Sequence, residues 1–324
     1  MPETFTSFMA RALHDPQRGY YARRVQAIGA KGDFSTSATL SPLLGQAIAH
    51  WLKEESKTMP EVRHIIEIGA GNGQLMQTIQ QSLGWWKRQR FQWHIVDTSE
   101  SLREQQRLRL GKKVKWHTDL TDALKTVGGK AFIYHNELLD AFPVILLQWQ
   151  NHQWFEVYVE LKGNCAQEML KVHSLTALDL ADFSVFQQSP RSKDQRVELH
   201  LSVRDWLRNW APVWAQGSML TVDYGDLFPA LYHRHPQGTL RAYLLHQRLN
   251  GTDIYQNIGR QDITADINFT DYRKWTQAFG WDEITFQDQA SFIGARTKSP
   301  SGQLMDLDGA GGAFKVVTHR KLFK

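Results

Sequence analysis

Acidic and glycine residues occur together in one short segment, Glu67-Ile-Gly-Ala-Gly-Asn-Gly73. Its three alternate glycines tolerate positive φ and let the backbone approach a ligand closely. An apolar run, Val62–Ile68, precedes the loop, and apolar residues follow it at helical spacing at Leu75, Met76, Ile79 and Leu83. We therefore expect a strand, a glycine loop and a helix whose N-terminus offers N–H groups to an anionic group.

The order of residues in this loop separates several nucleotide-type ligands. A dinucleotide fingerprint has its third small residue at position 74, where this chain has Gln74, and no Gly-Lys-Ser/Thr follows for a phosphate loop. Acid-x-Gly-x-Gly-x-Gly is the arrangement used for S-adenosylmethionine, whose carboxylate needs donors and whose ammonium needs a nearby acid. Glu67 can supply that acid. The alternative is a tight strand–helix turn with no ligand.

Two further acids follow the next two predicted strands. Asp97 stands 24 residues beyond Gly73, where a carboxylate can accept hydrogen bonds from a ribose diol. Its alternative role is the N-cap of the following helix, although Ser99 could do this. Asp119-Leu120 stands where an adenine would be bound, and a helix cap is the alternative for Asp119.

The fourth predicted strand, Ala131–Tyr134, runs into the polar segment Asn136–Pro143 at the same sheet edge. Methyl transfer from a sulfonium mainly requires that the acceptor be positioned and its proton managed. Paired acids suit a guanidinium, which carries a permanent charge and five donors, and Glu137 and Asp140 could form this pair. Their alternative role is that of helix N-terminal acids.

Strand-like and helix-like segments alternate from about residue 40, which indicates an α/β domain with a mostly parallel sheet. Ser41-Pro42 is typical of an N-cap and first helical position. The remaining expected elements are strands at Phe91–Ile95, Lys113–His117 and Met219–Val222, a helix at Leu102–Leu110, and an antiparallel pair at Glu283–Gln287 and Lys315–His319.

About eighty residues between the fourth and fifth strands depart from this alternation. Val144–Gln150 and Trp154–Leu161 predict a hairpin that turns at Asn151-His152, and Leu201–Trp214 predicts a helix. An insertion at the carboxyl end of a central strand commonly shapes a substrate site, with a packing role as the alternative. We expect a cap and lid segment at 1–60, a core at 61–140 and 218–324, and an inserted substrate region at 141–217.

Composition limits the remaining classes. The chain has 324 residues, 42% hydrophobic, and its longest apolar run is Val144–Leu147, far short of a membrane span. A single cysteine, Cys165, excludes an intrachain disulfide and a cysteine-built metal site. The histidines show no metal-ligand spacing, and Met1–Phe5 does not resemble a signal peptide. These features predict a cytoplasmic location, by default, and no metal.

A net charge of +5 makes an acidic partner worth considering. The densest basic stretch runs from Arg103 to Lys115 and contains a single acid, Glu104. Such a stretch is typical of a nucleic-acid footprint or, alternatively, of a solvated helix and its exit turn.

Seven segments, in order along nearly the whole chain, resemble the MidA-like class I S-adenosylmethionine-dependent methyltransferases. They are His14–Tyr21, Gly32–Ser37, Glu67–Gly73, Asn136–Pro143, Asp223–Gly225, Thr239–Arg241 and Asp262–Phe269. Mitochondrial members of this family are complex I assembly factors that dimethylate an arginine. The resemblance implies a Rossmann-like core with an elaborated substrate region and a protein arginine as acceptor.

The resemblance also implies that Gly32-Asp33-Phe34 covers the cofactor and that Glu137 contacts the substrate. The predicted S-adenosylmethionine contacts are then Gly32, Asp33, Phe34, Glu67, Gly69, Gly71, Gly73, Asp97, Asp119, Leu120 and Asn136. The predicted catalytic residues are Glu137 and Asp140. The alternatives are methylation of RNA or a small molecule, and a cofactor-binding assembly factor without turnover.

Overall fold

The computed structural model describes residues 1–23, 41–162, 165–190, 192–244 and 247–323. The chain divides into two compact units, each assembled from three separate stretches. The first unit draws on Met1–Arg24, Leu139–Trp206 and Tyr224–Trp275, and the second on Val25–Leu138, Leu207–Asp223 and Thr276–Lys324. The predicted division at residues 60, 140 and 217 stays a prediction.

The second unit is built on a sheet whose strand order is β15-β16-β10-β5-β2-β3-β4. The strands are β2 (His64–Ile68), β3 (Gln92–Val96), β4 (Val114–His117), β5 (Ala131–Asn136), β10 (Gly217–Asp226), β15 (Asp282–Asp288) and β16 (Phe314–Lys321). From β10 to β4 every pair is parallel, whereas β15 and β16 are antiparallel. The predicted α/β class with a mostly parallel sheet is confirmed.

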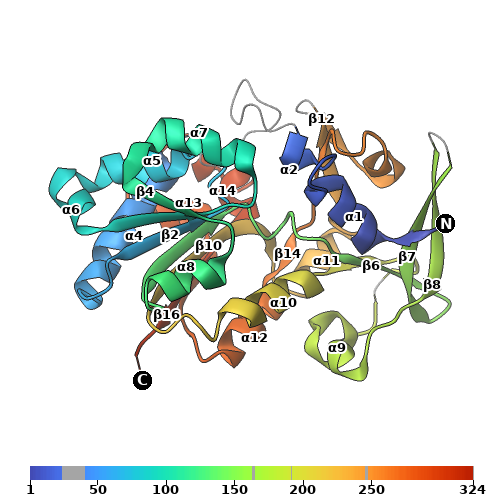
Figure 1. The fold of residues 1–324 in the computed structure, drawn as a ribbon. Coiled ribbons are helices and arrows are strands. Elements are labelled where there is room, and N and C mark those ends of the chain that lie inside the picture. The colour runs from blue at the N-terminus through green and yellow to red at the C-terminus, as the bar shows by residue number, and fades with distance from the viewer. Residues whose placement is uncertain (24–40, 163–164, 191, 245–246, 324) are drawn as a thin grey trace. The chain divides into compact units, whose positions relative to one another are not determined.

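Helices follow the strands of this sheet, and α4, α5 and α7 pack on one another while α8 packs against β3 and β4 (Figure 1). The helices of the unit are α4 (Leu43–Thr58), α5 (Gln74–Leu83), α6 (Trp85–Arg90), α7 (Glu100–Leu110), α8 (Leu120–Thr126), α13 (Gln289–Gly294) and α14 (Ala310–Ala313), with 3-10 turns η1 (Gly111–Lys113) and η4 (Gln303–Met305). The core-facing side chains of α5 are those predicted from its spacing.

Two helix ends differ from the sequence prediction. Pro42 is the N-cap of α4 rather than its first residue, and Ser41 Oγ accepts from the Leu43 N–H. The helix predicted to reach Trp214 ends at Trp210, because Pro212 disfavours the α conformation at the residue before it. Trp214 is nevertheless buried, and its indole N–H donates to the Ala131 carbonyl at 3.1 Å.

The first unit contains two antiparallel sheets, ordered β1-β7-β6-β9 with β8 on β7, and β12-β11-β13. Its strands are β1 (Glu3–Thr4), β6 (Ile145–Gln150), β7 (Gln153–Lys162), β8 (Cys165–Val172), β9 (Arg196–Leu199), β11 (Arg241–Leu244), β12 (Gln247–Leu249), β13 (Asp262–Thr264) and β14 (Ile267–Asn268). The predicted hairpin is confirmed: β6 and β7 pair antiparallel, and both turn residues, Asn151 and His152, have positive φ, as a tight two-residue hairpin turn requires.

Several helices complete the first unit. They are α1 (Phe5–His14), α2 (Tyr20–Arg23), α9 (Ala177–Asp182), α10 (Leu201–Trp210), α11 (Ala230–Arg234) and α12 (Phe269–Ala278), with 3-10 turns η2 (Ser184–Gln187) and η3 (Gly251–Tyr255). The ends of α10 and α12, and the start of β10, belong to the second unit.

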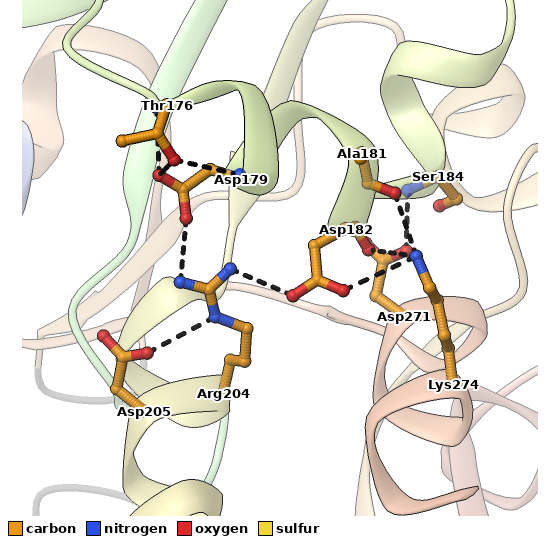
Figure 2. Close-up of polar contacts among 9 residues, drawn as sticks. All are labelled: Thr176, Asp179, Ala181, Asp182, Ser184, Arg204, Asp205, Asp271 and Lys274. Atoms are coloured by element: carbon orange, nitrogen blue, oxygen red, sulfur yellow. Dashed lines mark hydrogen bonds and ion pairs between the residues drawn. The ribbon is translucent and has the colours of Figure 1, made fainter. Parts of the chain in front are cut away.

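A charge network ties three of these helices together (Figure 2). The Arg204 guanidinium on α10 donates to Asp179 and Asp182 on α9, at 2.8 and 3.0 Å, and to Asp205 at 3.3 Å. Lys274 on α12 donates to the carbonyls of Ala181 and Asp182. Because its side chain is only 8% exposed, Arg204 depends on these carboxylates for compensation of its buried charge.

Candidate active site at the carboxyl edge of the sheet

The predicted cofactor residues of the second unit lie at one edge of its sheet. The chain leaves the central strand β2 for β3 and β4 on one side, then continues to β5 and β10 on the other. Because these strands are parallel, the segments after β2, β3, β4 and β5 emerge at the same edge. The gap between β2 and β5 is the topological switch point, where ligands bind in sheets of this kind.

The glycine loop begins directly after β2. Gly69, Gly71 and Gly73 have φ of 67°, 53° and 79°, a region that side chains disfavour. The Gly73 N–H donates to the Ala70 carbonyl at 2.8 Å, and α5 then begins at Gln74 without a side-chain cap. The loop is therefore a tight turn that leads into the N-terminus of α5, where Asn72 Oδ1 accepts from the Gln74 N–H at 3.0 Å. A helix N-terminus without a side chain at its N-cap favours an anionic group.

Glu67, on β2, is buried with 2% of its surface exposed, and its Oε2 accepts from the Tyr134 hydroxyl at 3.0 Å. Burial raises the pKa of Glu67 to about 8, despite the hydrogen bond from Tyr134, and the negative charge of Asp97 acts in the same direction. A buried carboxyl with this pKa is mostly protonated at pH 7 and loses its proton when a cation approaches it.

Asp97, after β3, is 8% exposed, and burial raises its pKa. Ser99, not Asp97, is the N-cap of α7, since the Leu102 N–H donates to Ser99 Oγ at 3.3 Å. Asp97 Oδ1 accepts from the Ser99 N–H at 3.0 Å, and Oδ2 accepts from Gln106 Nε2 at 2.8 Å. The cap interpretation of Asp97 therefore does not hold.

Gln106 on α7 is a site residue that sequence reasoning missed. It is fully buried, and its Nε2 donates both to Asp97 Oδ2 and to the Gly71 carbonyl, each at 2.8 Å. Its Oε1 accepts from Trp116 Nε1 at 3.0 Å. One amide thus connects the glycine loop to the Asp97 carboxylate. The only signal in the sequence was a glutamine on the apolar face of a helix.

Asp119 follows β4 and caps α8, with Oδ1 accepting from the Asp122 N–H at 3.0 Å. The cap interpretation of Asp119 is confirmed, whereas its adenine contact stays a prediction. The Leu120 side chain is 3% exposed and packs in the interior of the unit.

Asn136 and Glu137 end β5 beside the switch point. Asn136 Nδ2 donates to Glu137 Oε1 at 3.0 Å, and within the described part of the chain Asn136 Oδ1 is buried without a hydrogen-bond partner. Glu137 has φ 51°, a left-handed conformation that costs a non-glycine residue free energy. The Glu137 N–H donates to Val222 and the Leu138 N–H to Asp223 Oδ2, so β10 holds this strained turn in place.

No helix follows Glu137, since residues 137–144 form turns that lead into β6. The alternative role of Glu137 and Asp140 as helix N-terminal acids is therefore excluded. Asp140 belongs to the first unit, is 3% exposed, and its backbone carbonyl accepts from the Ala265 N–H at 3.0 Å.

The first unit also gathers described residues from four of the motifs that carried the family resemblance. Tyr21 donates to Asp262 Oδ1 at 2.9 Å, and burial raises the pKa of Asp262 to about 6. Arg241 forms an ion pair with Asp266 and lies over the Tyr224 ring at 4.7 Å. These distant motifs thus converge on one buried polar cluster, to which Asp140 contributes electrostatically through Tyr21 and Arg241.

Gly32, Asp33 and Phe34 lie outside the described residues, so their predicted contact with the cofactor stays a prediction. The residues that are described fit S-adenosylmethionine. The glycine loop and the start of α5 offer N–H groups, Glu67 offers an acid, and Asn136 Oδ1 is a buried acceptor without a partner. In the described part of the chain no three metal-ligating side chains form a group, and none of its helices is long and apolar enough to cross a membrane.

The basic stretch from Arg103 to Lys115, predicted as a possible nucleic-acid footprint, contains two kinds of residue in the structure: some with polar partners and some with no ion pair in the described part of the chain. Arg103 and Arg107 both pair with Glu100, and Arg109 donates to Gln77 at 3.2 Å. The arginines of the stretch thus have partners within the unit, whereas Lys112, Lys113 and Lys115 have no ion pair within the described residues.

Comparison with known proteins agrees with this geometry. The model of a family of S-adenosyl-L-methionine-dependent methyltransferases matches residues 44–287, three quarters of the chain. A crystal structure from Burkholderia thailandensis, bound to S-adenosyl-homocysteine, superposes with a TM-score of 0.85 at 25% identity and covers 99% of this chain and 88% of that one. A native structure from the same organism, 23% identical with a TM-score of 0.82, shares the fold.

The curated relatives include the mitochondrial protein arginine methyltransferase NDUFAF7 of Homo sapiens and its homologue in Caenorhabditis elegans. They are 24% and 26% identical over 85% and 83% of this chain. The chain spans about two thirds of the length of these relatives.

The predicted cytoplasmic location is wrong in the light of these relatives, which are named as mitochondrial proteins. That prediction was a default based on the first residues of the sequence, and these residues carry no information about location when the relatives are longer.

The fold, the loop at the switch point and the comparisons all indicate the same cofactor, S-adenosylmethionine. They also indicate that the protein is an enzyme that transfers the methyl group of this cofactor. The chain belongs to the family of S-adenosyl-L-methionine-dependent methyltransferases.

Proposed function

We propose that this methyltransferase acts on the guanidinium nitrogen of an arginine in a protein substrate. The observation that carries the proposal is Glu137 itself. Its backbone is strained and its carboxylate is oriented by Asn136, at the switch point next to the proposed cofactor loop. The names of the curated relatives, which are protein arginine methyltransferases, support the same acceptor. The pairing of Arg103 and Arg107 with Glu100 removes much of the support for an RNA acceptor.

We assign cofactor binding to the residues of the carboxyl edge. Gly69, Gly71 and Gly73 hold the methionine part, Glu67 faces its ammonium, and Asp97 accepts from the ribose hydroxyls. Asp119, Leu120 and Asn136 complete the site in this proposal. When bound, S-adenosylmethionine supplies an electrophilic methyl group on a sulfonium.

Glu137 has two tasks in this proposal. Its carboxylate accepts an N–H of the acceptor guanidinium, which holds the attacking nitrogen in line, and it receives the proton that this nitrogen loses. Asn136 Nδ2 donates to Glu137 Oε1 and so orients the carboxylate. Asp140 is the second acid that we assign to the guanidinium.

The test is the isosteric change Glu137→Gln. We expect methyl transfer to fall by about 10²–10³-fold, because an amide cannot take up the proton, while the Kd for S-adenosylhomocysteine changes by less than about threefold. Labelled-methyl transfer to arginine-containing proteins and calorimetric titration measure the two quantities.

Glu104→Gln serves as the matched control, since Glu104 is an exposed acid on α7 of the same unit. Unchanged transfer in Glu137→Gln would contradict the assigned role. No transfer by the wild-type protein, with S-adenosylhomocysteine binding intact, would favour an assembly factor without turnover.

A further inference from the structure

A cavity of about 220 Å³ lies in the second unit, away from the residues of the proposed methyl-transfer site. Its lining includes the side chains of Arg88, Phe91, Gln92, Trp93, Lys113 and Lys115. These residues come from α6, from the start of β3, and from the turn and strand at η1 and β4. Gln80 of α5 lines the cavity as well, so several elements that the sequence does not mark as a site meet there.

The cavity opens at the amino edge of the sheet. Gln92 is the first residue of β3, and Asp97 follows the last residue of the same strand. Five strand residues separate the two edges by about 16 Å at about 3.3 Å per residue. A ligand in the cavity would therefore occupy a second site, distinct from the one proposed for S-adenosylmethionine.

The charged side chains that line the cavity are all positive. Arg88, Lys113 and Lys115 line it, and none of the described residues in its lining carries a carboxylate. None of the three has an ion pair with another described residue, in contrast to Arg103 and Arg107, which share Glu100. Cations that converge without a counter-ion repel one another, and an anion bound between them relieves this repulsion.

A row of histidines lies across the strands next to these cations. His64, His94 and His117 form a hydrogen-bonded row across β2, β3 and β4, with ring nitrogens 3.0 Å apart. Burial lowers the pKa of each, and the charge of Lys115 lowers it further. His64 is also the sheet partner of Gln92, which lines the cavity, so the histidine row begins next to it at the amino edge.

We propose that this cavity binds a diphosphate group. Three cations on separate elements suit a compact anion with several charges, and phosphate oxygens accept readily from Arg and Lys. The volume is below the roughly 300–1,000 Å³ of sites that enclose drug-sized ligands, so the phosphates enter while a larger ligand stays partly outside. The group can come from inorganic pyrophosphate or from a nucleoside diphosphate.

The experiment titrates the full chain with pyrophosphate and with ADP by calorimetry at fixed ionic strength. We expect binding that Arg88→Ala, Lys113→Ala and Lys115→Ala each weaken about tenfold. Lys112→Ala is the control, because it removes the same charge one residue from Lys113 but outside the lining. The C2–H resonance of His64 should report a higher pKa when pyrophosphate is bound.

The two ligands separate the source of the diphosphate. Binding of ADP at least as tight as that of pyrophosphate indicates a nucleoside diphosphate, and binding of pyrophosphate alone indicates the free anion. The proposal is overturned by absence of pyrophosphate binding at millimolar concentration, or by an equal loss in Lys112→Ala. It is also overturned if only an RNA oligonucleotide binds. Titration of the same samples with S-adenosylhomocysteine shows that the variants are folded, and its result is independent of this site.

Discussion

The Glu67 carboxyl stands two residues before the glycine loop, accepts from the Tyr134 hydroxyl, and is buried with 2% of the residue exposed. A motif that places an acid before three glycines indicates a ligand with a positive group, but it does not reveal the protonation state of that acid. Burial settles this, since it raises the pKa of Glu67 to about 8 and leaves the carboxyl mostly protonated at pH 7.

We therefore expect S-adenosylmethionine binding at pH 7 to release up to about one proton, because the ammonium of the ligand lowers the pKa of Glu67. Calorimetry in buffers of different ionisation enthalpy measures this release. Glu67→Gln, which keeps an acceptor for Tyr134, should abolish the buffer dependence. A wild-type enthalpy that is the same in every buffer would exclude the contact between Glu67 and the ammonium.

At the scale of elements, the structure joins segments that no local pattern connects. Arg204 on α10 binds two carboxylates of α9, and Asp271 on α12 accepts from the Ser184 N–H at 2.8 Å (Figure 2). Burial raises the pKa of Asp179, but the hydrogen bonds from Thr176 and Arg204 outweigh it and lower the pKa overall. The short helix α9 thus depends on a charge network for its position.

Arg204→Ala should lower the free energy of unfolding by about 3 kcal/mol, since it leaves partly buried carboxylates without their cation. Arg204→Lys should recover part of this loss, because one ammonium cannot reach all three acids. Denaturant unfolding of the full chain gives the values. Lys274→Ala is the control: its side chain is 45% exposed, and a loss of less than about 1 kcal/mol is expected. An equal loss in the two alanine variants would contradict the larger role assigned to the buried guanidinium of Arg204.

At the scale of the whole molecule, buried titratable groups of both kinds set the response to pH. Burial lowers the pKa of His94 and His135 to about 3 and that of His200 to about 4. Burial also raises the pKa of Glu198 to about 7. The buried histidines make the folded protein less stable as the pH falls, whereas the buried carboxyls make it less stable as the pH rises. The two effects oppose each other near pH 5–6.

Comparison of the wild-type protein with the variant His94→Gln isolates the contribution of His94 to the pH dependence of stability. Between pH 6.5 and 3 the unfolded chain binds a proton at His94 that the folded chain does not, so wild type loses about 1.4 kcal/mol per pH unit from this group as the pH falls. The stability of wild type relative to His94→Gln should therefore decrease from pH 6.5 to pH 4.5. The measurement is a series of denaturant titrations, with the exposed His50→Gln as control. A difference that is constant with pH would contradict the prediction.

The sequence by itself determined what depends on neighbours along the chain. The strand, glycine loop and helix around Gly69, the hairpin at Asn151-His152 and the α/β alternation follow from local spacing and turn chemistry, which act over a few residues. These features were also the basis for predicting the family and its cofactor. The glycine motif could indicate the ligand because the residues that bind its methionine part are adjacent in the sequence.

Only the tertiary structure decided which distant side chains meet. It brought Gln106 to both Gly71 and Asp97, held Glu137 in a left-handed turn through β10, and placed Arg88 beside Lys113 and Lys115. It also assigned the cap of α7 to Ser99 and that of α8 to Asp119, which spacing left open. These contacts depend on strand order and burial, and both are set by the packing of the whole sheet rather than by any local pattern.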